Sequence, residues 1–502
     1  MKGPHVIVVP SSTLENWLRE FSVFCPELNV VPYYASQSER ANIRDEIMED
    51  RQGTDVVLTT YAVAKMKDDN RFLRKLKPVC AIWDEGHMLR NCKAAGYDAY
   101  SRIPARFRCI LSGTPLQNNL GELCSLLAFI LPSTFSDLDE LATIFNHKAK
   151  TDDGNSHAAL LSTRRVQRAK SMMTPFVLRR KKYQVLRHLP IKTKETKYCN
   201  LSASQRSLYD VEREKAHELW ASKAASKPST KMSIGIMMNL RKASIHPCLF
   251  RLVFDNKKIT KMAKACLKEP EFAQSNLDLV EEDLSVMSDM ELHRFCERYK
   301  SVRPFALKNE EWMDSGKVEA LSRLLEAYKA NNDRVLVFSQ FVQVLDILEH
   351  VMETLGVSFF RLDGSTNVAE RQSMIDEYNL NPSITVFLLS TKAGGAGINL
   401  ASANKVIIFD SSFNPQDDIQ AENRAHRVGQ TREVEVIRLV SRDTIEENIL
   451  RLGETKLALD DRIAGATDQG PTNRVDELGM LELEAMLRKD AGESQKTAEV
   501  KQ

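Results

Sequence analysis

Several features are scarce or missing in this 502-residue chain. No apolar run reaches 18 residues, so the sequence predicts no membrane span. The N-terminus has no basic stretch followed by an apolar core, which argues against secretion. Nine cysteines include no Cys-x-x-Cys pair, which disfavours a zinc site or a disulfide framework and favours a reducing compartment. The net charge of only +2 gives no indication of nucleic-acid binding.

Local charge is more informative than net charge. Between Pro175 and Lys194 there are seven basic residues and no acidic residue. Such a run suits contacts with phosphate groups, but a solvated face gives the same pattern. Composition alone leaves both interpretations open.

The order of apolar and polar segments predicts an α/β fold with two similar units. Short runs rich in Val and Ile alternate with helix-capable segments in the first 115 residues and again from Asp314, which predicts parallel sheets with crossover helices. Long helical stretches lie between them, including an acidic segment, 271–297, and the chain after about Gly465 is polar and predicted to be mostly disordered. The expected divisions are a first α/β unit, a largely helical insert, a second α/β unit and a polar tail, at 1–119, 120–313, 314–465 and 466–502.

Asp84-Glu85-Gly86-His87 directly follows the apolar run Ala81-Ile82-Trp83. Functional side chains of parallel sheets lie just past the strand ends. Two acids there suit a magnesium ion beside nucleotide phosphates, one orienting the metal's water shell and the other polarising an attacking water. Taken alone, the tetrapeptide is more often an ordinary charged turn.

Two segments of the second unit match this chemistry. Ser390–Leu400 follows a predicted strand and contains three glycines, which permit close approach of the backbone to a phosphate. Arg424 and Arg427 are three residues apart, which predicts one helical face from which two guanidinium groups reach a triphosphate across a cleft. A solvent-exposed basic helix is the alternative if this stretch is taken alone.

The order of these motifs resembles the Swi/Snf-like remodelling ATPases of helicase superfamily two. The resemblance covers roughly residues 3–465. The matching segments, besides those above, are Val8–Trp17, Leu58–Tyr61, Leu111–Asn118, Pro175–Thr193, Asn239–Lys242 with His246-Pro247, Arg334–Phe341 and Arg361–Thr366. The resemblance implies two RecA-like parallel-sheet lobes with a largely helical insert between them.

Asp-Glu-Gly-His, where relatives more often have Asp-Glu-Ala-His, and Met287–His293 in the acidic segment resemble the SMARCAD-type (Fun/Etl) subgroup. This similarity implies DNA-dependent ATP hydrolysis with magnesium, movement on duplex DNA, and remodelling of nucleosomes or exchange of histones in the nucleus.

The resemblance also assigns roles to residues. Asp84 would hold the magnesium ion and Glu85 would activate water, while Arg424 and Arg427 would complete catalysis. Nucleotide contacts would come from Gly397, His87 and Gln420. Contacts with the DNA backbone, which carry no base code, would come from Ser12, Thr60, Ser339, Gln340, Ser390 and Thr391.

One element of the family pattern is missing. The phosphate-binding loop, Gly-Lys-Thr or Gly-Lys-Ser, should precede Val6 by a few dozen residues, but the only Gly-Lys is Gly316-Lys317, followed by Val318. That loop supplies the backbone amides and the lysine that hold the triphosphate. We therefore expect a first lobe that is incomplete because of a truncated N-terminus, and an inactive or weakly active chain.

Two alternatives remain open from the sequence. One is a catalytically dead relative that binds DNA or chromatin; the retained acids and arginines argue against it. The other is a strand-separating helicase, which would need a wedge or pin element, and no segment has the signature of one.

Overall fold

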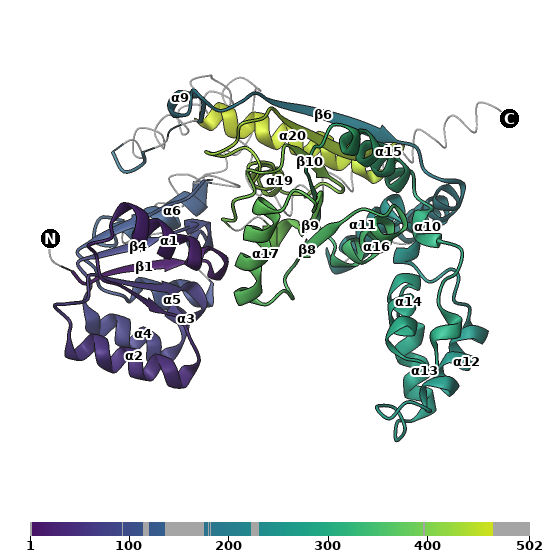
Figure 1. Cartoon of the computed structure of the whole chain (residues 1–502), viewed down its shortest axis with the longest axis horizontal. Coiled ribbons are helices and arrows are strands. Elements are labelled where there is room, and N and C mark those ends of the chain that lie inside the picture. Colours follow the sequence, from purple (N-terminus) through teal and green to yellow (C-terminus); the bar gives the residue numbers. More distant parts are fainter. Residues whose placement is uncertain are drawn as a thin grey trace, which may run out of the picture.

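The computed structural model describes residues 3–92, 94–113, 120–135, 175–178, 180, 182–221, 230–394 and 397–464. Two all-parallel sheets with crossover helices form two lobes, as the sequence predicted (Figure 1). The polar tail predicted to be mostly disordered, and residues 114–118 of the matching segment Leu111–Asn118, lie outside the described residues. No helix in the described part of the chain is long and apolar enough to cross a membrane.

The first lobe contains a five-stranded sheet in the order β2-β3-β1-β4-β5. β1 runs through its middle, with Val6 aligned to Val57 of β3 and to Ala81 of β4. The strands are β1 (His5–Val9), β2 (Val30–Tyr33), β3 (Val56–Thr60), β4 (Cys80–Trp83) and β5 (Phe107–Ile110). The helices are η1 (Ser11–Thr13), α1 (Leu14–Phe24), α2 (Gln37–Glu49), α3 (Tyr61–Lys65), α4 (Lys67–Leu76), η2 (Gly86–Leu89), α5 (Ala95–Ser101) and α6 (Leu120–Ile130).

One edge of the first sheet is open in the described structure. β5 pairs with β4 on one side and with no described strand on the other. Its side chains are exposed or only half-buried, and Phe107 is 61% exposed, whereas four residues of β1 are buried. An unpaired strand edge is a template for another strand.

The second lobe contains a six-stranded sheet in the order β6-β11-β10-β7-β9-β8. Its strands are β6 (Lys192–Cys199), β7 (Val335–Ser339), β8 (Phe359–Leu362), β9 (Val386–Ser390), β10 (Lys405–Ile408) and β11 (Val434–Ser441). β6 comes from the segment predicted to be a largely helical insert, and it pairs along its whole length with β11. β6 is a partly exposed edge strand, so its side chains are mostly charged and polar. It therefore lacks the apolar run from which the other strands were predicted.

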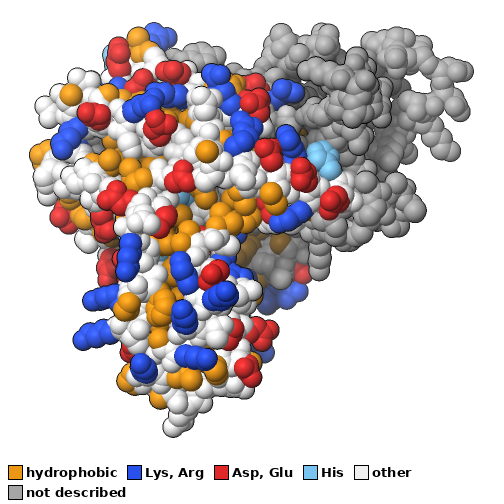
Figure 2. All heavy atoms as spheres, turned by 90° about the vertical axis from the view of Figure 1, so that its right-hand side faces the viewer, with side chains coloured by type: hydrophobic (Ala, Val, Ile, Leu, Met, Phe, Trp, Pro, Cys, Tyr) orange, Lys and Arg blue, Asp and Glu red, His pale blue; other side chains and the backbone are white. Residues whose placement is uncertain are grey.

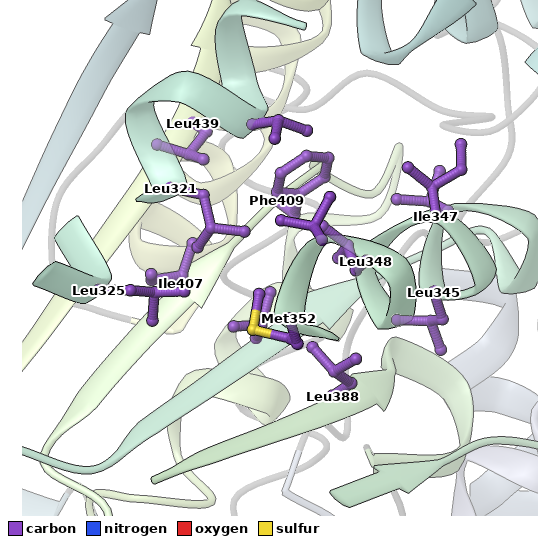
Figure 3. Packing of buried hydrophobic residues seen from close by; sticks show 14 of the residues in the cluster. Leu321, Leu325, Leu345, Ile347, Leu348, Met352, Leu388, Ile407, Phe409 and Leu439 are labelled. Carbon is purple, nitrogen blue, oxygen red and sulfur yellow. The ribbon is translucent and has the colours of Figure 1, made fainter. Parts of the chain in front are cut away.

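Helices on both faces bury the second sheet. Figure 3 shows Leu321, Leu325, Leu345 and Leu348 packed against side chains of the central strands. Alternate residues of a strand point to opposite faces, so Val335 and Val337 join this cluster while Leu336 and Phe338 join the cluster on the other face. The helices of this lobe are α15 (Gly316–Ala330), α16 (Val342–Thr354), α17 (Val368–Leu380), α18 (Thr391–Gly394), α19 (Pro415–Glu422) and α20 (Ile445–Ala464).

The region between the lobes is otherwise helical, as expected. Its elements are α9 (Lys182–Val185), α10 (Ala203–Ala221), α11 (Thr230–Ile245), η3 (Pro247–Leu249), α12 (Asn256–Cys266), α13 (Leu277–Ser285), α14 (Asp289–Arg298), η4 (Arg303–Phe305) and η5 (Glu311–Met313). The acidic segment forms α13 and α14. Together with α12 they surround a separate apolar core and project from the second lobe (Figure 1). We call residues 253–313 the helical subdomain.

Candidate nucleotide site between the lobes

Asp84 is fixed at the end of β4 by contacts on both sides. Its backbone N–H donates to the Val8 carbonyl at 2.9 Å, which continues the sheet. Its carboxylate accepts hydrogen bonds from Trp17 Nε1 and from the Glu85 backbone N–H, each at 2.9 Å. Tyr61 donates its hydroxyl to the Asp84 carbonyl at 2.7 Å. The first acid therefore has a defined orientation before any ligand arrives.

Close packing explains the glycine that follows the two acids. Glu85 has a left-handed φ of +50°, and the next residue, Gly86, donates its backbone N–H to the Leu111 carbonyl at 2.9 Å. A Cβ atom at Gly86 would lie 2.0 Å from Cγ2 of Ile110. The β-branched side chain on β5 leaves room only for glycine here. The side chain of His87 lies outside the described residues.

The two arginines lie beyond the helix on which they were expected. Helix α19 ends at Glu422, and Arg424 and Arg427 occupy turns after it, so the prediction of a shared helical face is wrong. The Glu422 carboxylate at the helix end is fully buried and forms ion pairs with Lys192 and Lys194. Past that point the chain turns back, and the Leu400 N–H donates to the Arg424 carbonyl at 3.2 Å.

Both arginines nevertheless interact electrostatically with the acids of the first lobe. The pKa of Arg424 is lowered to about 9, chiefly by burial and also by the positive charge of Arg427, while Glu85 and Asp84 act in the opposite direction. Burial likewise lowers the pKa of Arg427, and the same two acids oppose this. Charges interact in this way only across short distances. The structure thus brings the acids of the first lobe and the arginines of the second near one another.

Gly397 lies where the lobes touch. It has a left-handed φ of +66°, and a Cβ atom there would lie 1.8 Å from Cγ2 of Thr13 in the first lobe. The Gly397 carbonyl accepts a hydrogen bond from Arg427 Nη1 at 3.2 Å. Both the backbone angle and the contact exclude a side chain at this position.

Part of the basic run has an intramolecular role that the sequence did not reveal. Lys182 donates to Asn423 Oδ1 and to the His426 carbonyl, each at 2.9 Å. With Lys192 and Lys194 on Glu422, these lysines hold the segment that carries the arginines. Lys182, Lys192 and Lys194 therefore make contacts within the protein, which neither interpretation of the basic run had included. Lys192 and Lys194 are two residues apart, which on a strand places both side chains on the same face. This spacing was the feature of the sequence from which a shared partner could have been expected.

The residues expected to contact DNA lie at or just after strand ends in both lobes. Thr60, Ser339 and Ser390 end β3, β7 and β9 and are buried. Thr60 and Ser390 accept backbone N–H groups of the following helical turns at 3.3 Å. Ser12 lies in η1, half-buried, and Thr391, which begins α18, is buried.

A buried carboxylate that the sequence did not single out organises one of these strand ends. Asp410 is fully buried and accepts hydrogen bonds from the Ser339 hydroxyl and from the Gln340 backbone N–H. It is also paired with Arg241 of α11, whose guanidinium lies between the rings of Phe341 and Phe413, at 5.0 and 4.8 Å. Only the tertiary structure joins these distant segments.

The donor atoms at the end of β4 suit a magnesium ion. Mg²⁺ prefers carboxylate oxygens and retains several waters, and Asp84 and Glu85 supply such oxygens beside the cleft. When bound, the ion would neutralise phosphate charge. Trp17 orients Asp84 through its hydrogen bond. Arg424 and Arg427 of the second lobe add positive charge near the two acids. Gln420, half-buried on α19, precedes the arginine turn, and its contact with nucleotide stays a prediction.

Comparison with known proteins identifies this two-lobed arrangement. Residues 1–249 match the model of the SNF2-related domain, and residues 316–429 match that of the helicase conserved C-terminal domain. The chain is 51% identical to the ATP-dependent helicase fft2 of Schizosaccharomyces pombe over 91% of its own length and 37% of that protein. It is 48% identical to the ATP-dependent helicase FUN30 of Saccharomyces cerevisiae over 92% of its length and 42% of that protein.

A solved structure gives the same answer. The C-terminal part of the Fun30 ATPase domain is 44% identical, with a TM-score of 0.54, and the alignment covers 61% of this chain and 99% of that one. The chain belongs to the SNF2-related family of helicase-like ATPases. Within it, the chain falls in the Fun30 and SMARCAD-type branch, as its Asp-Glu-Gly-His motif predicted. It spans about two fifths of the length of FUN30 and fft2.

Proposed function

We propose that this chain is the motor of an ATP-dependent translocase that moves on duplex DNA and remodels nucleosomes in the nucleus. The observation that supports this proposal is the electrostatic interaction of Asp84 and Glu85 in the first lobe with Arg424 and Arg427 in the second, beside the contact between Gly397 and Thr13. Acids that hold magnesium and arginines that stabilise charge on the transferred phosphoryl group are the parts that phosphoryl transfer requires. Names of relatives such as FUN30 support ATP dependence.

Turnover by these 502 residues alone should be weak. The sequence contains no Gly-Lys-Thr or Gly-Lys-Ser to hold the triphosphate, and no described strand pairs with the outer side of β5. We expect little DNA-stimulated ATP hydrolysis from this chain. A longer form that also carries a phosphate-binding loop with Gly-Lys-Thr should hydrolyse ATP in the presence of DNA.

The test compares variants of that longer form. Arg427→Ala should reduce DNA-stimulated turnover on the order of a thousandfold, and Arg427→Lys should not restore it, because lysine lacks the planar fork. Arg323→Ala, an exposed arginine of α15, serves as the control and should retain full turnover. Full turnover in Arg427→Ala would refute the role given to Arg427. No turnover in the unaltered longer form would favour a catalytically dead, DNA-binding relative.

A further inference from the structure

The helical subdomain carries a row of lysines on the outer face of α12. The inner face of this helix consists of Ile259, Met262, Ala263 and Cys266, which are buried in the subdomain's own core. Lysines occupy the opposite face, and each of them is exposed: Lys257, Lys258, Lys261, Lys264 and, just past the helix, Lys268. No acidic residue occurs between Asn256 and Lys268. We call these five residues the lysine row.

Few protein groups compensate this charge. Lys258 donates to the Val253 carbonyl at 2.9 Å and lies over the Phe254 ring. Among the described residues, none of the five forms an ion pair with a carboxylate. Like charges three and four residues apart on a helix repel one another. An anionic partner would remove this repulsion, whereas an ordinary solvated helix face usually alternates its charges.

The row has the dimensions of a short stretch of nucleic-acid backbone. From Lys257 to Lys268 the helix rises about 16 Å, at about 1.5 Å per residue. Each DNA strand carries one phosphate per about 3.4 Å of helix axis, so the row spans about five phosphates. Lysines bind phosphates as point charges on flexible stems, which suits contact without base reading.

The row also has a fixed position relative to the motor. Arg294 of α14 pairs with Asp346 of α16, and Gln343 donates to Glu291 at 2.7 Å. The ring of His350 in α16 lies 4.9 Å from that of His293 and 5.2 Å from that of Trp312, measured between centroids. These contacts attach the subdomain to the second lobe.

The subdomain projects away from the first lobe and from the interlobe cleft (Figure 1). α12 lies at the right-hand edge of that view, which is the side turned to the viewer in Figure 2. There, several Lys and Arg side chains gather on the lower protrusion. DNA bound on this face would therefore be a different stretch from that held at the cleft.

We propose that the lysine row of α12 binds the phosphate backbone of a second stretch of duplex DNA, outside the interlobe cleft. This inference rests on the proposed function only in that the motor acts on DNA. On a nucleosome, such a contact would anchor the second lobe while the cleft engages its own stretch of duplex.

The experiment measures binding of the full chain to a duplex of about 60 base pairs without ATP, by fluorescence anisotropy across a salt series. One variant replaces Lys257, Lys261, Lys264 and Lys268 with Gln, which preserves helix propensity. The control replaces four exposed lysines of the first lobe with Gln, namely Lys65, Lys67, Lys75 and Lys77. Circular dichroism and thermal melting verify that both variants fold.

The plot of log K against log salt loses about 0.9 in slope for each phosphate contact removed. The row variant should lose about 3 to 4, and the control variant less than 1. Equal losses in the two variants would overturn the proposal. An unchanged DNA slope combined with weaker binding of histone octamer would also overturn it, and would assign the row to an acidic protein surface. Because the assay uses no ATP, failure of the ATPase proposal leaves its outcome unaffected.

Discussion

Arg19 of α1 and Asp376 of α17 join the two lobes through a two-pronged ion pair. Arg19 Nη1 donates to Asp376 Oδ1 at 3.0 Å, and Nη2 donates to Oδ2 at 2.6 Å. The hydrogen bonds from Arg19 lower the pKa of Asp376. The pair connects α1 of the first lobe to α17 of the second, so it favours the arrangement in which the lobes are in contact.

Breaking this pair should open the cleft without unfolding either lobe. Arg19 is 55% exposed, and exposed pairs contribute about 1 kcal/mol or less. We expect Asp376→Asn to lower the closed population about two- to fivefold, measured by energy transfer between dyes on the two lobes. The exchange of Arg19→Asp with Asp376→Arg should restore closure. Arg323→Ala, which breaks an exposed pair within α15, should change nothing. Unchanged transfer in Asp376→Asn would contradict the prediction.

Gly397→Ala should weaken closure more strongly, because the new Cβ meets Thr13 Cγ2 and the left-handed φ strains alanine by about 1 kcal/mol. The same dye pair reports the effect. Thr13→Ser removes Cγ2 but keeps the hydroxyl, which donates to the Pro10 carbonyl at 3.0 Å, so the double variant should recover part of the closed population. Gly364→Ala, at a site with open space around the missing Cβ, is the control. Identical behaviour of the two alanine variants would refute the assignment.

The glycine of Asp-Glu-Gly-His should be coupled to Ile110. Gly86→Ala forces its Cβ against Ile110 Cγ2, and overpacking of this kind costs about 1–3 kcal/mol in the free energy of unfolding. Leucine is not branched at Cβ and so lacks the Cγ2 methyl group that causes the clash. Ile110→Leu should therefore offset much of this loss of stability in the double variant. Urea denaturation of the four-member cycle measures the coupling. Additive effects of the two changes would exclude it.

Stability should fall in acid through His246, which joins α11 to the helical subdomain. Its Nδ1 accepts the Cys248 N–H at 3.1 Å, so Nε2 carries the proton and donates to the Trp312 carbonyl at 2.9 Å. Complete burial lowers the pKa of His246 from 6.5 to about 4. The unfolded chain takes up a proton near pH 6.5 and the native chain only near pH 4, so the free energy of unfolding decreases across that interval.

The total decrease from this group is on the order of 3 kcal/mol. Denaturation midpoints at pH 7, 6, 5 and 4 measure it. His246→Asn keeps an acceptor and a donor but does not titrate, so its stability should be lower at pH 7 and depend less on pH. His188, which is exposed, provides the control: His188→Asn should keep the full pH dependence. A pH profile unchanged in His246→Asn would contradict this account.

The sequence alone determined the class of fold and the parts of the site. Continuous apolar runs such as Val6–Val9 and Val335–Phe338 define parallel strands, because only buried strands of that type are apolar on both faces. Asp84 and Glu85 could be located because they follow such a run directly. The order of motifs then specified the family and its branch, and the comparisons confirmed both.

Only the tertiary structure decided features that depend on contacts between distant segments. β6 is a charged edge strand that pairs with β11 over its whole length. Its sequence has no apolar pattern, so this pairing could not be predicted locally. Helix α19 ends at Glu422, whose carboxylate is paired with Lys192 and Lys194, about 230 residues away in the sequence. The need for glycine at position 86 comes from Ile110 on the neighbouring strand. Local patterns cannot contain such information, because these partners meet only when the chain folds.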